Sequence, residues 1–156
     1  MTVKAIPDGY HSITPYLIVG GAAEAIEFYK QAFGAVEHLR LNSPDGKVAH
    51  AEMKIGNSIV MMGESCPEYN TRDPKQLGGT PVGLMIYVED VDSVFARALS
   101  VGGTELRPVQ DQFYGDRSGT LTDPFGHQWT ISTHKEDLSQ EVIVERMKAM
   151  YSGQPS

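Results

Sequence analysis

The chain has 156 residues, of which 40% are hydrophobic and 21% are charged, and its formal net charge is −7. This composition is typical of an ordinary globular protein with enough chain to build a core. The acidic balance disfavours nucleic acids and anionic membrane surfaces as partners, and Cys66, the one cysteine, has no second cysteine with which to form an intrachain disulfide.

The sequence shows no pattern of a signal peptide or of a membrane-spanning helix. The first ten residues lack the apolar run of a signal peptide, and no stretch of about 18 apolar residues could span a membrane. We therefore expect a cytoplasmic protein with no membrane or nucleic-acid partner, folded as one domain over residues 1–156.

The first half of the chain alternates strand and helix signals. Residues 12–19 have the pattern of a strand, and apolar residues then recur at helical spacing over 22–33, where Gly34 is a natural helix stop. Further strands are predicted over 36–41, 47–55 and 58–62.

Residues 63–81 are rich in Gly, Pro, Ser and Asn, which is typical of a loop. We interpret this segment as a linker between two halves. A loop of this length is either disordered or functional, for example as a lid.

The second half repeats the order of the first. A strand is predicted over 82–88, a helix over about 91–101 with Asp90 as N-cap, and a strand over 104–110. A loop over 111–119 and strands over 119–123 and 127–133 complete the half.

A final helix is predicted from Ser139 to about Tyr151. Its apolar positions need to pack on the body or on a second subunit, and they are Val142, Ile143, Met147, Met150 and Tyr151.

The two halves match at a nearly constant offset. Val19 and Val88 are 69 residues apart, as are Gly34 and Gly103, whereas the turn glycines Gly56 and Gly126 are 70 apart. A repeat of this kind predicts an α+β fold of two tandem βαβββ modules in pseudo-twofold pairing. We expect a curved, barrel-like mixed sheet around a cavity, with the helices outside. The predicted segments are module one (about 10–64), the linker (about 65–81), module two (about 82–134) and a C-terminal helical tail (136–151).

Strand alternation predicts which side chains face the cavity. The candidate ligand-binding residues on the strands are Thr14, Tyr16, His50, Glu52, Met62, Met85, Tyr87 and Thr130. Tyr114 and Arg117 join them from the predicted loop at the cavity mouth. This mixture of hydroxyl, apolar and ionisable groups is typical of a ligand cavity.

These motifs resemble those of the vicinal oxygen chelate superfamily, which includes glyoxalase I, extradiol dioxygenases, and bleomycin and fosfomycin resistance proteins. The resemblance rests on the repeated unit, on residues 25–29 followed by 33–35, and on the Asp-Pro-Phe-Gly turn at 123–126. His50-Ala51-Glu52, together with residues 112–117, most resembles the PhnB-like branch. The fold is shared by proteins with many different reactions, so it specifies no chemistry.

The resemblance also implies four positions at which metal-dependent members bind a divalent cation with His and Glu. In this sequence they fall on Thr14, Val60, Gly83 and Thr130, none of which is a histidine or a carboxylate. Such a cation needs several of these ligands. We therefore predict that the usual metal site is absent and that no cofactor is bound, unless a metal uses a non-standard site.

His50 and Glu52 are the candidate catalytic residues, two apart on one strand. They are interpreted either as a general base with its partner, as an incomplete metal pair, or as a buried polar pair. Arg117 either binds a ligand carboxylate or phosphonate, with Tyr114 stacking beside it, or pairs with Asp116 or Asp123 to hold its loop.

Three hypotheses for function follow. The first is a protein that binds a small molecule in the sheet cavity without chemistry, similar to the resistance-type members. The second is a glyoxalase-like lyase or isomerase that is metal-free or uses a relocated site at His50 and Glu52. The third is a protein–protein module. A homodimer is expected in each case, because sheet edges and the tail helix offer surface to a second copy.

Overall fold

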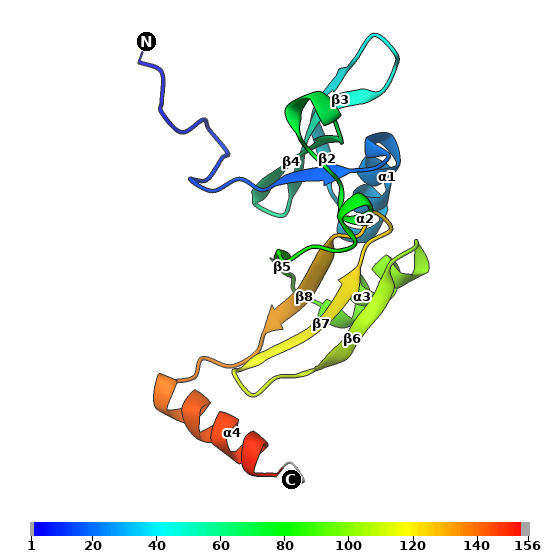
Figure 1. Cartoon of the computed structure of the whole chain (residues 1–156). Coiled ribbons are helices and arrows are strands. Elements are labelled where there is room, and N and C mark those ends of the chain that lie inside the picture. The colour runs from blue at the N-terminus through cyan, green and yellow to red at the C-terminus, as the bar shows by residue number, and fades with distance from the viewer. Residues whose placement is uncertain (1, 154–156) are drawn as a thin grey trace.

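The computed structural model of the protein describes residues 2–153 and shows two modules of the same plan (Figure 1). Residue 1 and residues 154–156 of the predicted domain range lie outside the described residues. Module one consists of β1 (Tyr16–Val19), α1 (Ala22–Phe33), β2 (Val36–Asn42), β3 (Val48–Ile55) and β4 (Ser58–Glu64). Module two consists of β5 (Gly83–Tyr87), α3 (Val91–Ser100), β6 (Thr104–Asp111), β7 (Asp116–Thr122) and β8 (Gln128–His134). The linker between them holds the 3₁₀ helix η1 (Pro67–Tyr69) and α2 (Pro74–Leu77), and α4 (Gln140–Ser152) follows module two.

Each module forms its own four-stranded mixed sheet, in the order β1-β4-β3-β2 and β5-β8-β7-β6. In both, the first strand runs parallel to the last, and the other pairs are antiparallel. The predicted α+β fold of two βαβββ modules is therefore confirmed.

The barrel-like closure that we expected is not formed within one chain. In the described part of the chain, no strand of one sheet pairs with a strand of the other. The modules meet instead through α1 and α3, which pack against each other, so each sheet is curved but keeps one face that no helix covers. We call this uncovered side the open face.

The sequence determines where α1 begins and ends. The side chain of Glu64, at the end of β4, accepts hydrogen bonds from the backbone N–H groups of Gly21 (3.1 Å) and Ala22 (2.6 Å), which are otherwise unpaired at the helix N-terminus. At the other end Gly34 adopts φ 67°, a left-handed conformation that glycine reaches without strain. The predicted helix bounds of 22–33 are the observed ones.

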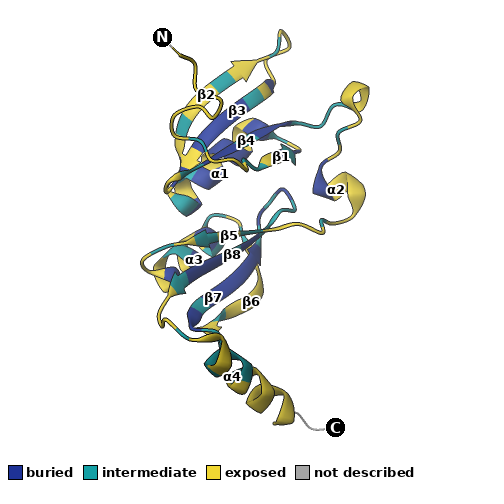
Figure 2. Cartoon of the chain, turned by 90° about the vertical axis from the view of Figure 1, so that its left-hand side faces the viewer, coloured by how far each residue is buried: buried dark blue, intermediate teal, exposed yellow. Residues whose placement is uncertain are grey.

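The core lies between each sheet and its helix (Figure 2). Its largest fully buried side chains include Trp129, Tyr29, Met53 and Met62. The seam between the modules is held by polar contacts as well, since His127 Nε2 lies 2.8 Å from the carbonyl oxygen of Ile18.

Two predicted strand boundaries differ from the observed ones by three residues or more. Residues 12–15 are not strand, since β1 begins at Tyr16, and β7 begins at Asp116 rather than 119. The run from Asp116 to Gly119 has the composition of a loop. It is strand because its open face is polar and bonded to β8, while Arg117 on the other face is bonded to α3.

The tail helix was predicted correctly, and Ser139 caps it by accepting a hydrogen bond from the N–H of Val142 (3.4 Å). α4 projects from the end of β8 (Figures 1 and 2), and none of its described residues is buried. Among residues 2–153, no helix combines the length and apolarity needed to cross a lipid bilayer.

Candidate functional site

Strand pairing defines which side chains share the open face of module one. Met61 on β4 lies opposite both Tyr16 on β1 and Glu52 on β3, and His50 is two residues before Glu52 on the same face. The alternating neighbours Ala51 and Met53 are fully buried toward α1. The structure therefore brings Tyr16, His50 and Glu52 together, as alternation predicts.

Two residues lie on the opposite face from the one expected. Met62 is fully buried and pairs with Ala51, and Val60 pairs with Met53, so both point into the core under the helix. Met62 is therefore not on the open face, although it was predicted to line the cavity.

Met61, not Val60, is the structural equivalent of Thr130. Tyr16 pairs with Met61 in module one, and Met85 pairs with Thr130 in module two, with the same spacing along the chain. The turn glycines gave an offset of 70, whereas the strands keep 69, and a slip of one residue moves a side chain to the other face.

Four side chains of module one form a hydrogen-bonded chain on the open face. The hydroxyl of Tyr16 lies 3.0 Å from Nδ1 of His50, and Nε2 of His50 lies 3.1 Å from Oε1 of Glu52. Tyr10, from the segment before β1, donates its hydroxyl to Oε2 of Glu52. We call this set the Tyr16–His50–Glu52–Tyr10 chain.

Glu52 is the charged member of the chain and is 8% exposed. The hydrogen bond from Tyr10 lowers the pKa of Glu52 and outweighs burial, and the bond from His50 adds to this. The same bond to Glu52 raises the pKa of Tyr10, and burial raises the pKa of Tyr16. At neutral pH the carboxylate of Glu52 therefore lies between two protonated phenols. Tyr10 is bonded to it directly, and Tyr16 is linked to it through the imidazole of His50.

Cavities flank the chain on both sides. One of about 610 Å³ is lined by Tyr16 together with residues of the β2–β3 turn and of the 64–71 segment, among them Lys47, Cys66 and Tyr69. Another of about 390 Å³ lies between the segment before β1 and the sheet, where Tyr10, Thr14, Glu52 and Met61 line it.

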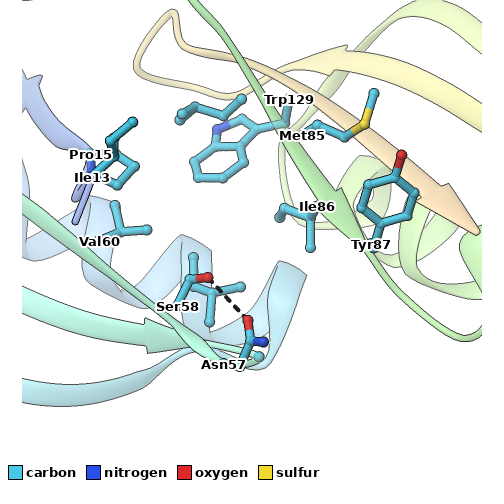
Figure 3. A pocket seen from close by; sticks show the side chains of 12 residues that line it. Ile13, Pro15, Asn57, Ser58, Val60, Met85, Ile86, Tyr87 and Trp129 are labelled. Carbon is cyan, nitrogen blue, oxygen red and sulfur yellow. Dashed lines mark hydrogen bonds between the residues drawn. The ribbon is translucent and has the colours of Figure 1, made fainter. Parts of the chain in front are cut away.

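Figure 3 shows a third cavity, of about 550 Å³, at the seam between the modules. Its walls are mainly apolar. Ile13, Pro15 and Val60 come from module one and the segment before it, and Met85, Ile86, Tyr87 and Trp129 come from module two. Val60 and Trp129 reach this cavity from the buried layer rather than from an open face.

The open face of module two carries a different polar cluster. Asp116, 5% exposed, accepts hydrogen bonds from Tyr87 (3.0 Å) and Ser132 (3.3 Å), and its other oxygen lies 2.7 Å from Nδ1 of His134. Burial raises the pKa of Asp116, but the bonds from His134, Tyr87 and Ser132 outweigh it and lower the pKa overall. Nearby, the hydroxyls of Thr120 and Thr130 are 2.9 Å apart.

Arg117 and Tyr114, the two residues expected at the cavity mouth, are engaged by neighbouring side chains. Arg117 lies on the helix-facing side of β7 and bonds both oxygens of Asp92 on α3 (2.8 and 2.9 Å) and Oδ1 of Asp111 (3.2 Å). It therefore pairs with neither Asp116 nor Asp123. Its guanidinium group donates these three hydrogen bonds to carboxylates of the protein itself, whereas we expected it to bind the anionic group of a ligand or one of those two acids. Tyr114 packs edge-on against Phe113, with ring centroids 5.2 Å apart.

The donor atoms on the open faces do not fit a divalent cation. Of the four positions that the family resemblance implies, corrected to Thr14, Met61, Gly83 and Thr130, none carries an imidazole or a carboxylate. His50 and Glu52 offer only two such ligands, and in the part of the chain that the structure describes no three His, Cys, Asp or Glu side chains group to hold a metal ion.

Sequence reasoning missed Tyr10, Asp116 and His134. Tyr10 precedes the repeat and follows no strand pattern, and Asp116 and His134 stand at the ends of strands that were predicted too short. Residues 113–119 have the composition of a loop, and no signal in the sequence marks Asp116 as a strand residue.

Comparisons with known proteins agree with this architecture. The family model described as the Glyoxalase/Bleomycin resistance protein/Dioxygenase superfamily matches residues 9–131. Protein Mb0911c of Mycobacterium bovis is 39% identical over 145 residues, covering 91% of this chain and 95% of that protein. The crystal structure of PA1353 from Pseudomonas aeruginosa aligns with a TM-score of 0.66 at 25% identity, over 81% of this chain and 99% of that one. The PhnB protein from Bacillus cereus aligns with a TM-score of 0.61 at 24% identity, over 79% and 99%. The chain therefore belongs to the glyoxalase, bleomycin resistance protein and dioxygenase superfamily.

Proposed function

We propose that this protein, as a PhnB-like member of the superfamily, binds a small organic molecule on the open face of module one. The observation that carries the proposal is the Tyr16–His50–Glu52–Tyr10 chain between cavities of about 610 and 390 Å³. A few convergent polar groups within mostly apolar walls are the usual make-up of a small-molecule site.

The side chains at the positions where relatives bind a metal ion favour ligand binding without a metal. With no imidazole or carboxylate at the four positions that relatives use, ligand recognition falls to hydroxyls, to one imidazole and to apolar contacts. The cavities also argue against a purely protein–protein module, for which an accessible hollow on the sheet would have no use.

Thermal-shift screening tests the binding proposal. Amphipathic aromatic compounds and phosphonates are the probes, and a ligand present at about 100 times its Kd stabilises the folded protein by about 2.7 kcal/mol. A compound that raises Tm should lose at least tenfold in affinity with His50→Ala. The control is Lys148→Ala on α4, which should bind as the unchanged protein does. A library that shifts Tm with none of its members would contradict the proposal.

A second candidate function is a glyoxalase-like enzyme centred on His50 and Glu52. It is favoured by one observation, that both nitrogens of His50 are hydrogen-bonded and one of them faces a carboxylate, which is the arrangement of an oriented general base. Metal analysis separates its two versions. A stoichiometric Zn, Ni, Mn or Fe that is lost with His50→Ala would identify a relocated metal site, and its absence would leave only metal-free chemistry.

We further propose that the protein forms a homodimer. α4 presents Met147, Met150 and Tyr151 to solvent, and β5 leaves one edge of its sheet unpaired in the described chain. Exposed apolar side chains and open edges are surfaces that a second copy of the same chain commonly covers.

A further inference from the structure

The proton positions in the Tyr16–His50–Glu52–Tyr10 chain follow from the chemistry of its members. The carboxylate of Glu52 only accepts hydrogen bonds, so Nε2 of His50 carries the proton that it donates across 3.1 Å. In the neutral imidazole Nδ1 is then an acceptor, and the hydroxyl of Tyr16 donates to it across 3.0 Å. The oxygen of Tyr16 keeps its lone pairs free for a further donor.

We propose that Tyr16 is the ligand-contacting end of a proton relay, and that the cavity of about 610 Å³ takes a planar, conjugated molecule with a weakly acidic hydroxyl group. The proposal rests on the proposed function and specifies the ligand of that site. Tyr16 touches the ligand, His50 receives the proton, and Glu52 is a positioning residue that acts through His50.

The surroundings of Tyr16 leave its hydroxyl accessible. The residue is 48% exposed and lines the cavity. Gly63 on β4 makes room for it, because a Cβ at that position would lie 2.9 Å from the Tyr16 hydroxyl oxygen and 2.8 Å from the carbonyl oxygen of Ala49. Glycine inside a strand weakens the strand and commonly marks such a close approach.

The far end of the relay is fixed. Glu52 is nearly buried, and its second oxygen is occupied by the hydroxyl of Tyr10. The carboxylate lies 3.1 Å from Nε2 of His50 and holds the ring so that Nδ1 faces the hydroxyl of Tyr16. This is the role that the third member plays in triads of nucleophile, histidine and carboxylate.

The walls of the cavity suit an apolar, aromatic ligand body. Ile18, Val48 and Pro67 supply apolar surface, and the ring of Tyr69 on η1 lies at the same hollow. The charged side chains that line it are Asp45, Lys47 and Glu64. Glu64 is already bonded to the N-terminus of α1, and Asp45 accepts from the backbone N–H of Lys47. Lys47 is the one ammonium group among them, and its charge acts on the neighbouring carboxylate of Asp45.

The proton transfer from the ligand to His50 needs no other reactant. The O–H bond of the ligand breaks and its proton bonds to the oxygen of Tyr16, while the former Tyr16 proton bonds to Nδ1 of His50. The products are a bound ligand oxyanion, an unchanged Tyr16 and an imidazolium paired with Glu52. One proton moves from ligand to His50, and no electrons are exchanged.

The test uses 4-nitrophenol, whose phenolate absorbs at longer wavelength than the neutral phenol. Spectra of the probe are recorded across a pH series with and without the protein. The expected result is about tenfold more phenolate for the bound probe than for the free probe at the same pH, which is about one unit of pKa. Tyr16→Phe and His50→Gln should both abolish this shift, whereas Tyr151→Phe, on α4, should retain it.

Three results would overturn the relay: a probe that does not bind, a probe that binds as the neutral phenol, or a phenolate shift that persists in both Tyr16→Phe and His50→Gln. Cooperative unfolding of each variant confirms that a lost signal is not a lost fold. If other compounds raise Tm while 4-nitrophenol shows no shift, the relay is wrong and the binding function stands. If no compound raises Tm, the binding function itself fails.

Discussion

The hydroxyl of Tyr29 on α1 donates a 2.5 Å hydrogen bond to Oδ2 of Asp123, in the turn between β7 and β8. The same oxygen accepts from Nε1 of Trp129 (2.8 Å), and Oδ1 accepts from the backbone N–H groups of Phe125 (2.9 Å) and His127 (3.0 Å). One buried carboxylate thus joins a helix of module one to the hairpin of module two. Burial, and then the charge of Asp123, raise the pKa of Tyr29 well above its usual value, so the phenol stays a donor.

Removing this carboxylate should be among the most damaging single changes in the chain. Asp123→Ala leaves four donors without their acceptor, and we expect a loss of about 3–5 kcal/mol in the free energy of unfolding. Tyr29→Phe removes one donor and leaves three, so it should cost about 1–3 kcal/mol. Urea unfolding measures both, with Tyr69→Phe, an 80% exposed tyrosine, as the control. Equal stability of Asp123→Ala and the unchanged protein would refute this account of the seam.

Two strand glycines should differ in how well they tolerate the same substitution. A Cβ at Gly119 would lie 2.8 Å from Cγ2 of Val109 and 2.9 Å from Cε2 of Phe95, whereas a Cβ at Gly83 meets no atom within 4 Å. We expect Gly119→Ala to lower the free energy of unfolding by about 1–3 kcal/mol through overpacking, and Gly83→Ala to change it by no more than about 0.5 kcal/mol. Chemical denaturation measures the pair side by side, and a Gly83→Ala variant that is the weaker of the two would contradict the packing seen here.

The repeat made most of the fold predictable from sequence, because each half constrained the other. Alternation placed His50 and Glu52 together correctly, since Ala51, Met53 and Ile55 of β3 form a buried apolar face. Alternation failed at Val60 and Met62 because β4 is apolar on nearly all positions of both faces. The pattern therefore does not show which residues face the helix, and the alignment of the two halves at β4 rested on the turn glycines alone. A strand buried on both sides gives no alternation to follow.

The contacts of the site were less predictable than its position. Tyr10 reaches Glu52 from a segment with no regular structure, and Arg117 bonds Asp92, which is 25 residues away in the chain. Pairings between distant polar side chains depend on how a helix lies over its sheet, and a composition pattern holds no information on that geometry. The sequence pattern therefore predicts no role for Tyr10, and it leaves Arg117 as either a ligand-binding or a loop-holding residue without identifying Asp92 as its partner.

The acidity of the medium should affect the end of module two through His134. Its Nδ1 lies 2.7 Å from Asp116 and its Nε2 lies 2.8 Å from Asp137, and hydrogen bonds to Asp116 and then Asp137 raise its pKa. Because the folded-state pKa is raised, the stabilisation is present in full below the unfolded-state value of about 6.5 and is lost as the pH rises through the folded-state value.

We therefore expect the difference in Tm between the unchanged protein and His134→Gln to be largest near about pH 5.5 and to shrink toward about pH 8. Asp137→Asn should show a smaller change of the same sign, because the bond to Asp116 remains. The lowered pKa of Asp116 acts in a separate, more acidic range, where its stabilisation is lost as the pH falls. A Tm difference that grows with pH would contradict the assignment.

Removal of divalent cations should leave the protein unchanged. His50 and Glu52 supply two of the ligands that a structural or catalytic cation needs, and both are already bonded to Tyr16 and Tyr10. Dialysis against EDTA should therefore not alter Tm, and elemental analysis of the purified protein should find less than one equivalent of any transition metal. A stoichiometric metal whose removal lowers Tm would instead favour the relocated site at His50 and Glu52.

The proposed dimer should depend on the apolar side of α4. A helix of 13 residues is marginal alone in water, and no residue of α4 is buried within its own chain. Met147 and Met150 lie one turn apart and are 37% and 46% exposed. The double substitution of Met147→Glu and Met150→Glu places two charges on this side of the helix. It should convert the dimer to a monomer, as measured by sedimentation velocity at micromolar concentration. Ala149→Glu adds a charge on the opposite side of the same helix and should leave the dimer intact. If the unchanged protein sediments as a monomer, α4 has some other partner and the dimer is wrong.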